Sequence, residues 1–371
     1  MTRGDLHING RFLTQRISGV QRYARELLTA FDGLLAGDPA LANHLGPVPV
    51  WYPKGPPVID PPHWRVLVPT ALPGFSGHAW EQVTLGRKAR GGFLVSLCGS
   101  GPLLCHSQLV VFHDANTWTI PEAFSRTYRA FHRFVRPRLA NRVRRIGTVS
   151  SFSAGELATC LGVPQDRFTV IYNSAEHILT PNEDPETLTR YGLEPGQYLF
   201  VAGNQSPNKN IARLIQARQI IGPGAPTLAI AGGFTTGVSQ ADTASSDGVM
   251  FLGRVTDEEL RVLYAQSRAF VFPSLYEGFG IPPLEAMALG TPVLSSNSSA
   301  MPEVLGDAVK YFDPTDATAI AACVKDFVAL PDRDRHALAM RGQERAGRFS
   351  WATSAHHLLD LVLQETGAGQ A

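Results

Sequence analysis

The chain has 371 residues, of which 44% are hydrophobic and 18% are charged, and its formal net charge is +1. This length suffices for two ordinary domains, and a charge so near neutral argues against a dedicated nucleic-acid-binding protein. The cysteines have no zinc-binding spacing, so we expect free thiols; they are Cys98, Cys105, Cys160 and Cys323. The sequence contains neither the apolar segment of a signal peptide nor a run of about 18 apolar residues that would span a membrane. We therefore expect a cytoplasmic protein.

The first predicted helix begins at Ser18 and Gly19 and continues through Leu28. Apolar residues recur at helical spacing along it, and Ser18 is a suitable N-cap. The N-terminus of such a helix offers backbone N–H groups to an anion, although these residues alone favour an ordinary capped helix.

Short apolar runs predict buried strands through the first half of the chain, over residues 48–52, 64–68, 93–97, 108–112, 146–149 and 167–172. The strand 108–112 ends in His113 and Asp114, and the strand 167–172 ends at Asn173. A lone histidine at the end of a strand is more often structural than catalytic.

The segment from Arg126 to Arg145 contains eight arginines and no acidic residue. Arg129, Arg133 and Arg136 share one face of a predicted helix, while Pro137 argues against one continuous straight helix here. Two interpretations of the charges stay open. They form either a solvated helix surface or an electrostatic surface for anionic lipid headgroups or a lipid pyrophosphate.

The second half alternates between strands and helices. Strands are predicted over 198–202, 227–231, 249–252, 269–272, 292–295 and 309–312, with helices over 211–221, 257–267, 283–289 and 315–329 and at the C-terminus. This order is typical of a doubly wound parallel sheet. The polar stretch 174–195 between the two halves predicts a linker.

The stretch Tyr276–Gly290 joins two of these strands through a loop and a short helix. Glycines in the loop let the backbone approach a ligand closely, and prolines open the helix. Glu277 is predicted on the loop and Glu285 in the first turn of the helix, where the helix dipole alone already favours an acid. Because open α/β sheets bind ligands at the carboxyl ends of their strands, this stretch is a candidate ligand site.

This stretch resembles the Glu-x7-Glu signature of the retaining glycosyltransferases of family 4. The similarity continues through Gly290–Val293 and Ala300–Val304, and weaker similarity covers most of the chain. The resemblance implies a GT-B fold, in which two Rossmann-like α/β domains present parallel sheets to each other across a cleft. It implies an acceptor-binding domain over 1–180, a nucleotide-sugar-binding domain over 181–350, and a C-terminal helix over 351–371 that packs back on the first domain.

The resemblance also implies roles for individual residues of the second domain. Lys209 would contact the diphosphate of the donor, Glu277 the hydroxyls of the transferred sugar, and Glu285 the ribose. The remaining donor-binding residues beside them would be Gly278, Phe279, Gly280 and Ile281. Many family members carry an arginine five residues before the lysine, where this chain has Asn204, and Arg254 is the candidate to compensate.

In the first domain, the resemblance places Ser18 and Gly19 beside the donor diphosphate, although many members have two glycines there. His113 would lie close to the donor sugar and the acceptor, which favours a catalytic role for it. Asn173 is included among the donor-binding residues.

The reaction implied is transfer with retention of the anomeric configuration, in which an oxygen of the departing diphosphate helps to remove the acceptor proton. The enzyme then positions the groups and stabilises charge, and no carboxylate nucleophile is needed. We expect metal-independent transfer without a cofactor other than the sugar nucleotide.

The resemblance is closest to bacterial mannosyltransferase-like members, so GDP-mannose is the expected donor. The expected acceptor is a saccharide or lipid-linked saccharide of cell-surface polysaccharide synthesis, with a peripheral contact to the inner face of the plasma membrane through Arg126–Arg145. Two alternatives remain. One is a nucleotide-sugar-binding protein without transfer activity, which Asn204 favours, and the other is another GT-B enzyme such as a sugar-nucleotide epimerase.

Overall fold

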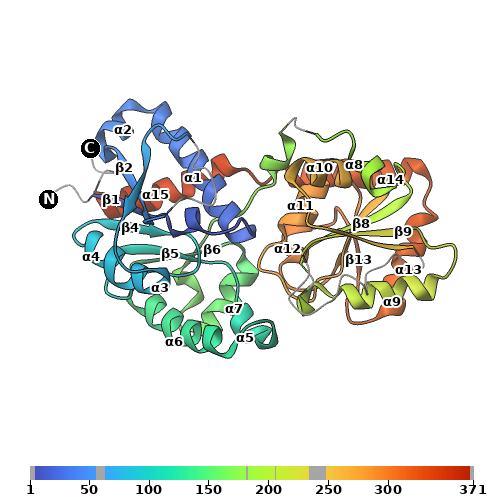
Figure 1. Cartoon of the computed structure of the whole chain (residues 1–371), viewed down its shortest axis with the longest axis horizontal. Coiled ribbons are helices and arrows are strands. Elements are labelled where there is room, and N and C mark those ends of the chain that lie inside the picture. The colour runs from blue at the N-terminus through green and yellow to red at the C-terminus, as the bar shows by residue number, and fades with distance from the viewer. Residues whose placement is uncertain (1–4, 56–62, 181–182, 205, 234–247, 368–371) are drawn as a thin grey trace. The chain divides into compact units, whose positions relative to one another are not determined.

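The structure is a computed structural model that describes residues 5–55, 63–180, 183–204, 206–233 and 248–367. The chain divides into two compact units (Figure 1). The first unit comprises Met1–Asn173 and Ser350–Ala371, and the second comprises Ser174–Phe349. Within the described ranges, no helix is both long and apolar enough to cross a membrane.

A parallel sheet forms the centre of the first unit, with seven strands in the part of the chain that is described and the order β3-β2-β1-β4-β5-β6-β7. Its strands are β1 Leu6–Asn9, β2 Val48–Pro53, β3 Leu67–Leu72, β4 Phe93–Ser96, β5 Gln108–Phe112, β6 Arg145–Thr148 and β7 Phe168–Val170. All neighbouring strands are parallel. The order reverses at β1 and β4, so the switch point lies between these two strands, where doubly wound sheets bind their ligands.

Helices cover both faces of this first sheet (Figure 1). They are α1 Gly19–Gly37, α2 Pro39–Leu45, α3 Gly77–Ala79, α4 Gly86–Lys88, α5 Asn116–Thr119, α6 Arg126–Arg142, α7 Ser151–Leu161 and α15 Trp351–Thr366. Shorter turns are the 3-10 segments η1 Arg11–Thr14, η3 Pro121–Ala123 and η4 Gln165–Arg167 and the π-helix η2 Trp80–Leu85. The last helix, α15, packs against α1 and is tied to β6 by Glu365, which pairs with Arg144 and Arg145 at 3.0 and 2.7 Å.

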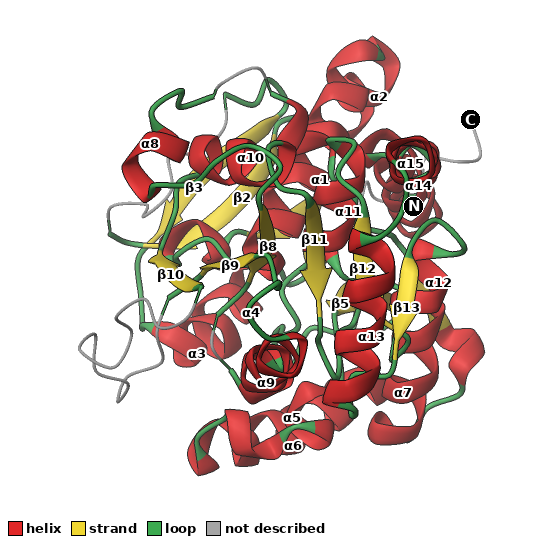
Figure 2. Ribbon diagram, turned by 90° about the vertical axis from the view of Figure 1, so that its right-hand side faces the viewer, coloured by secondary structure: helices red, strands yellow, loops and turns green. Residues whose placement is uncertain are grey.

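The second unit repeats this plan, with six parallel strands among its described residues in the order β10-β9-β8-β11-β12-β13 (Figure 2). They are β8 Tyr198–Ala202, β9 Thr227–Ala231, β10 Val249–Gly253, β11 Ala269–Phe272, β12 Val293–Ser296 and β13 Lys310–Phe312. The helical segments are η5 Glu176–Leu179, α8 Thr187–Tyr191, η6 Pro207–Lys209, α9 Ile211–Ile221, α10 Asp257–Ala265, α11 Ile281–Ala288, α12 Met301–Leu305, α13 Ala317–Val328 and α14 Asp332–Ala346. The switch point of this sheet lies between β8 and β11.

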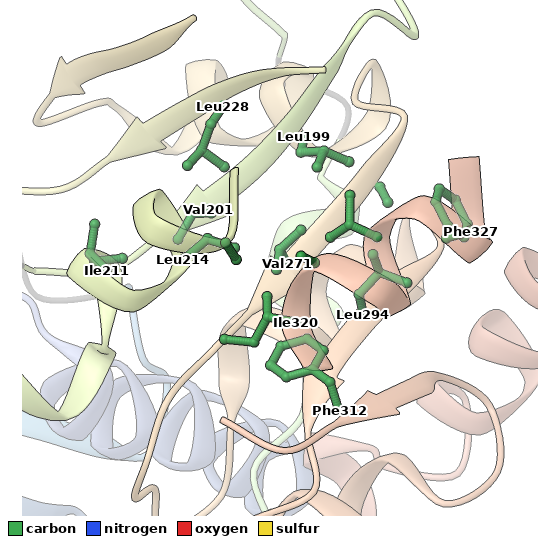
Figure 3. Close-up of a cluster of buried hydrophobic side chains, with 14 of the residues drawn as sticks. Leu199, Val201, Ile211, Leu214, Leu228, Val271, Leu294, Phe312, Ile320 and Phe327 are labelled. Atoms are coloured by element: carbon green, nitrogen blue, oxygen red, sulfur yellow. The ribbon is translucent and has the colours of Figure 1, made fainter. Parts of the chain in front are cut away.

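The core of the second unit lies between its sheet and helices α9 and α13 (Figure 3). Leu199, Val201 and Val271 extend from central strands and are at most 4% exposed. Leu214 of α9 and Ile320 of α13 pack against them. Burial of these apolar side chains fixes the strands of the switch point, so the loops that leave β8 and β11 start from rigid positions.

The predicted fold class of two Rossmann-like α/β units is confirmed, but one central strand was missed. β1 has only four residues and includes His7 and Asn9, so its sequence is too short and too polar to predict a buried strand. The strand predicted over 64–68 begins later, at Leu67. The Asp32 carboxylate accepts the backbone N–H groups of Arg65, Val66 and Leu67 at 2.8 Å, so these groups stay outside the regular strand pairing at its start.

Two further predictions were wrong. Helix α6 runs without a break from Arg126 to Arg142, with Pro137 inside it. A proline removes one hydrogen bond and costs about 3 kcal/mol, which burial of Val135, Leu139 and Ala140 on the same helix offsets. The stretch 174–195, predicted as a linker, belongs to the second unit and contains η5 and α8, although residues 181 and 182 lie outside the described ranges.

Candidate active site

The loop after β11 is shaped by a glycine and by a hydrogen bond to the next loop. Gly280 has φ +97°, and a Cβ there would lie 2.6 Å from Met301 Cε, so no other residue fits without a shift. The backbone N–H of Glu277 donates to Ser299 Oγ at 3.0 Å. These constraints hold Glu277 at the carboxyl end of β11 and start helix α11 at Ile281.

The loop after β8 is tied to the loop after β11. Asn210 has φ +57°, and its side-chain amide donates to the carbonyls of Pro273 at 3.0 Å and Pro314 at 2.7 Å. The Leu275 N–H donates to the carbonyl of Asn208 at 2.8 Å. Gln205, within the predicted lysine-bearing loop, lies outside the described residues. The two loops on either side of the switch point therefore form one connected structure.

This connection brings together Lys209 and Glu277, which are 68 positions apart in the sequence. Lys209 Nζ lies 2.5 Å from Glu277 Oε1 and 5.5 Å from the centre of the Phe272 ring. The lysine side chain is 19% exposed and the glutamate 16%, so the pair is only partly screened by solvent. A diphosphate bound here would share the ammonium group with Glu277, while hydroxyl groups would donate to the free lone pairs of the carboxylate.

Glu285 is buried and held by two other side chains. Its Oε1 accepts from His177 Nε2 at 2.7 Å, and its Oε2 accepts from the Tyr264 hydroxyl at 2.9 Å. The residue is 5% exposed. The prediction that Glu285 lies in the first turn of its helix was wrong, because α11 begins at Ile281 and Glu285 is its fifth residue. The burial of Glu285 is thus compensated by side-chain partners and not by the helix N-terminus.

The other predicted residues of the second unit lie around this pair. Gly278 and Phe279 are buried, and the Phe279 ring meets that of Phe349 edge-on at 5.5 Å. Arg254 is exposed after β10, and a Cβ at Gly233 would lie 2.9 Å from its Nε. Since β9 separates β8 from β10, the strand ends that lead to Lys209 and Arg254 are about 10 Å apart. Compensation for Asn204 by Arg254 stays a prediction.

In the first unit, His113 is held by its neighbours at the end of β5. Its Nε2 donates to the Leu97 carbonyl at 2.7 Å, and its ring meets that of Tyr23 edge-on at 4.8 Å. Because a carbonyl only accepts, the proton resides on Nε2, and Nδ1 keeps a lone pair for a hydrogen bond. Burial lowers the pKa of His113 below its ordinary value, which favours the neutral ring.

The other predicted residues of the first unit are Ser18 and Gly19, at the start of α1, and Asn173. Ser18 caps α1, as predicted, in a capping box with Gln21, and Gly19 is the first residue of the helix. Both are exposed, so the N–H groups of this turn are accessible. Asn173 is 2% exposed, and its Oδ1 has no hydrogen-bond partner in the described part of the chain.

Comparison with known proteins relates the chain to glycosyltransferases. The family model for glycosyl transferases group 1 matches residues 189–345. This match lies within the second unit of the chain. O-antigen chain mannosyltransferase B of Escherichia coli is 35% identical over 254 residues, which are 66% of this chain and 66% of that protein. O-antigen chain mannosyltransferase RfbU of Salmonella typhimurium is 30% identical over 235 residues, 62% of this chain and 63% of that protein. The chain thus spans just under two thirds of either relative.

Solved structures of this fold extend over the whole chain. Sucrose-phosphate synthase from Thermosynechococcus elongatus has a TM-score of 0.73 at 18% identity, with 99% of this chain and 100% of that chain covered. Anabaena HepE in complex with UDP and glucose has a TM-score of 0.69 at 17% identity, with 98% of this chain and 100% of that chain covered. The predicted GT-B fold class is confirmed, and the family match supports the predicted glycosyltransferase family.

The group 1 glycosyl transferase match includes Lys209, Glu277 and Glu285 but begins after His177. No signal in the sequence marked His177, because it lies in a stretch predicted as a linker and meets Glu285 across 108 positions. Tyr264 was missed as well, since an apolar helix position predicts only core packing. The assigned roles of the site residues stay predictions, and His177 and Tyr264 join them as side chains that hold Glu285.

Proposed function

We propose that this group 1 glycosyl transferase moves mannose, with retention of configuration, from GDP-mannose to a saccharide or lipid-linked acceptor of cell-surface polysaccharide synthesis. The observation that carries the proposal is the 2.5 Å contact of Lys209 with Glu277 at the switch point of the second sheet. A cation for the diphosphate and an acceptor for sugar hydroxyls are thus adjacent. Two relatives at 30% and 35% identity are mannosyltransferases, which supports mannose as the sugar.

In the proposed reaction, the bond between the anomeric carbon and the diphosphate oxygen breaks while the acceptor oxygen bonds to the same face of that carbon. The acceptor proton passes to the departing diphosphate oxygen. Lys209 stabilises the negative charge that grows on the leaving group, and Glu277 holds the sugar by its hydroxyls. Glu285, held by His177 and Tyr264, accepts hydrogen bonds from the ribose hydroxyls.

The first test is a thermal-shift series of the purified chain with GDP, UDP, ADP and dTDP, each with and without its common sugars. A ligand at 100 times its dissociation constant stabilises the folded protein by about 2.7 kcal/mol, so a true donor raises the midpoint of unfolding clearly. We expect GDP and GDP-mannose to give the largest shifts. A larger shift with another nucleotide contradicts the donor assignment, and no shift with any of them contradicts the binding site.

A binding protein without transfer activity is the alternative that Asn204 favours, since the diphosphate would then have one cation fewer. Release of GDP from GDP-mannose by the purified chain, with water as the acceptor, separates the two. Release that depends on Lys209 supports a transferase. Tight donor binding without any release, in the presence of candidate acceptors, supports the binding protein.

A peripheral contact with the inner face of the plasma membrane is a further part of the proposal. Arg126, Arg138 and Arg142 of α6 are exposed, as is Arg133, so this helix presents several cations to solvent. The predicted surface is nevertheless smaller than the arginine run, because Arg144 and Arg145 pair with Glu365 and Arg136 is 8% exposed. Each arginine near an anionic bilayer contributes about 1 kcal/mol to binding.

A further inference from the structure

A second group of buried charged and polar side chains lies in the first unit, outside the residues that match the family model. It gathers at the carboxyl ends of β1 and β4, the switch point of the first sheet. We call it the Arg136 cluster; its members are Asn9, Arg11, His78, Glu81, Ser100, His132 and Arg136. Its members come from β1, η1, α3, η2, the loop after β4 and α6.

The acidic member of the Arg136 cluster has several partners. Glu81 is 1% exposed, and its Oε1 accepts from Asn9 Nδ2 at 2.7 Å and from Ser100 Oγ at 3.0 Å. Arg11 Nε and His78 Nδ1 lie 3.7 and 3.6 Å from the carboxylate. Burial alone would raise the pKa of Glu81, but these neighbours lower it, so Glu81 is ionised at neutral pH. Its charge is balanced by Arg11.

The second arginine is not balanced. Arg136 is 8% exposed, and no carboxylate of the described residues lies within 4 Å of its guanidinium group. Its Nη1 reaches the Asp114 carbonyl only at 3.5 Å, and its Nε has no hydrogen-bond partner within the described ranges. A buried guanidinium without a counter-charge is unfavourable, and a bound anion would remove this penalty.

His132 lies one helical turn before Arg136 and is also unpartnered. It is 4% exposed, and both of its ring nitrogens lack a hydrogen-bond partner among the residues described. Burial and the charge of Arg136, with smaller effects of His78 and Arg11, lower the pKa of His132 to about 3, although Glu81 opposes this. The neutral ring can donate one hydrogen bond to an oxygen of an anion held by Arg136.

The loop after β4 and the end of β5 both lie beside Arg136. Its Nη2 lies 3.2 Å from the position of a Cβ at Gly99, whose φ of +72° also disfavours a side chain. The backbone of the loop after β4 thus approaches the guanidinium closely, which the absence of a side chain at Gly99 permits. Asp114, whose carbonyl Arg136 contacts, directly follows His113.

Aromatic rings line the outer side of the cluster. The Tyr128 ring lies 4.1 Å from that of His132 and is stacked with Phe124 at 5.3 Å, while Phe131 lies 4.3 Å from His78. Tyr128 is 40% exposed. A buried cation behind partly exposed aromatic rings suits an organic phosphate, whose charged group enters and whose sugar or hydrocarbon part contacts the rings.

We propose that the Arg136 cluster binds a phosphate group of the acceptor, with Arg136 and His132 contacting its oxygens and the acceptor hydroxyl directed toward His113. This assignment to the acceptor rests on the proposed transferase function. The phosphate could belong to a soluble glycosyl phosphate or to an isoprenoid diphosphate, and both present the same oxygens to Arg136.

The test is calorimetric titration of the full-length chain, with its donor site saturated by GDP, using mannose 1-phosphate, geranyl diphosphate and neutral methyl mannoside. We expect at least one phosphate ester to bind and methyl mannoside not to bind. Arg136→Met keeps the aliphatic stem and removes the charge. It should weaken binding of the phosphate ester by about 30-fold or more. The ester that binds more tightly distinguishes a soluble from a lipid-linked acceptor.

Arg138→Met is the matched control, since Arg138 is exposed on the same helix and stacks on Phe134 at 3.6 Å. It should leave the affinity within about threefold. Because Arg136 has no counter-charge, Arg136→Met should keep or raise the thermal midpoint of the unliganded protein. His132→Gln keeps a hydrogen-bond donor, so it should weaken binding of the phosphate ester less than Arg136→Met does.

Three results overturn the proposal: no ester bound by the GDP-loaded chain, equal weakening by both arginine variants, or a lower thermal midpoint with unchanged ester affinity in Arg136→Met. The last would assign Arg136 to the fold. If GDP itself fails to bind, the donor assignment fails separately. Ester binding to the unloaded chain that depends on Arg136 would then still support an anion site here.

Discussion

The two sheets have the same strand order around their switch points, yet the charges gathered there are balanced in one unit and unbalanced in the other. In the second unit, Lys209 lies 2.5 Å from Glu277. In the first unit, Arg136 is 8% exposed without a carboxylate within 4 Å among the described residues. A balanced pair is stable by itself and must exchange a partner to bind an anion, whereas an unbalanced cation gains a partner when an anion binds.

A similar contrast separates the two glutamates of the family signature. Glu277 is partly exposed and contacts Lys209, whose side chain is long and flexible. Glu285 is buried between His177 and Tyr264. We infer that Glu277 can reorient as a sugar binds, while Glu285 is fixed before the nucleotide arrives. The first arrangement suits interactions that change during the reaction, and the second suits recognition of an unchanging group.

The largest expected effect tests the balanced pair. Lys209→Ala should lower kcat/KM for transfer by about 100-fold or more, because the leaving diphosphate loses its nearest proposed cation. Steady-state assays of GDP release with a fixed acceptor measure this change. Lys325→Ala, on the exposed side of α13, removes the same charge from the same unit and should leave kcat/KM unchanged.

A near-normal rate for Lys209→Ala would show that another group, with Arg254 the first candidate, carries the diphosphate. Lys209 and Glu277 would then form an ion pair that stabilises the fold, and the second unit would no longer show a balanced pair at its binding site. A double variant with Arg254→Ala would separate these cases, because only a functional Arg254 adds a further loss of rate.

The second prediction tests the fixed glutamate. Glu285→Gln removes a buried charge and should weaken GDP binding by about 30-fold, because the ribose hydroxyls lose a charged acceptor. His177→Gln should weaken GDP binding less, since it only frees the carboxylate to move. Calorimetry on both variants measures the dissociation constants directly.

His336→Gln is the control for this pair, because His336 is exposed on α14 and should not change the affinity. The fixed-glutamate interpretation fails if Glu285→Gln binds GDP as the unaltered chain does. If His177→Gln is the more damaging change, His177 itself contacts the nucleotide and its role as a positioning residue is wrong.

Elements with a continuous apolar run or a clear helical repeat of apolar residues were predictable from the sequence to the residue. The strands 108–112, 198–202 and 269–272 and the helix 211–221 coincide with β5, β8, β11 and α9. Each is buried along its length or along one face, so composition and pattern agree with its environment. β1 fails this test because the polar residues His7 and Asn9 interrupt its apolar residues.

The residues of the candidate sites likewise divide into those that the sequence predicts and those that it does not. Lys209 and Glu277 lie on loops that directly follow predictable strands, so the sequence predicts that they approach each other. His177 and Arg136 derive their importance from contacts that the sequence does not encode locally. His177 meets a residue 108 positions away, and Arg136 looks like its exposed neighbours on α6 until packing buries it.

The smallest expected effect concerns the arginines that remain on the surface of α6. Arg129→Glu with Arg133→Glu should weaken binding to vesicles containing anionic lipid by several-fold at low salt, because two cations that attract the anionic headgroups are replaced by anions. Arg133 Nε also donates to the Thr117 carbonyl at 2.9 Å, so the thermal midpoint of the variant must be measured alongside. Arg333→Glu with Arg341→Glu, on the exposed side of α14, makes the same change of net charge elsewhere. Equal loss in both double variants, or loss in neither, would identify the α6 arginines as a solvated surface and leave Arg136 as the functional cation of the run.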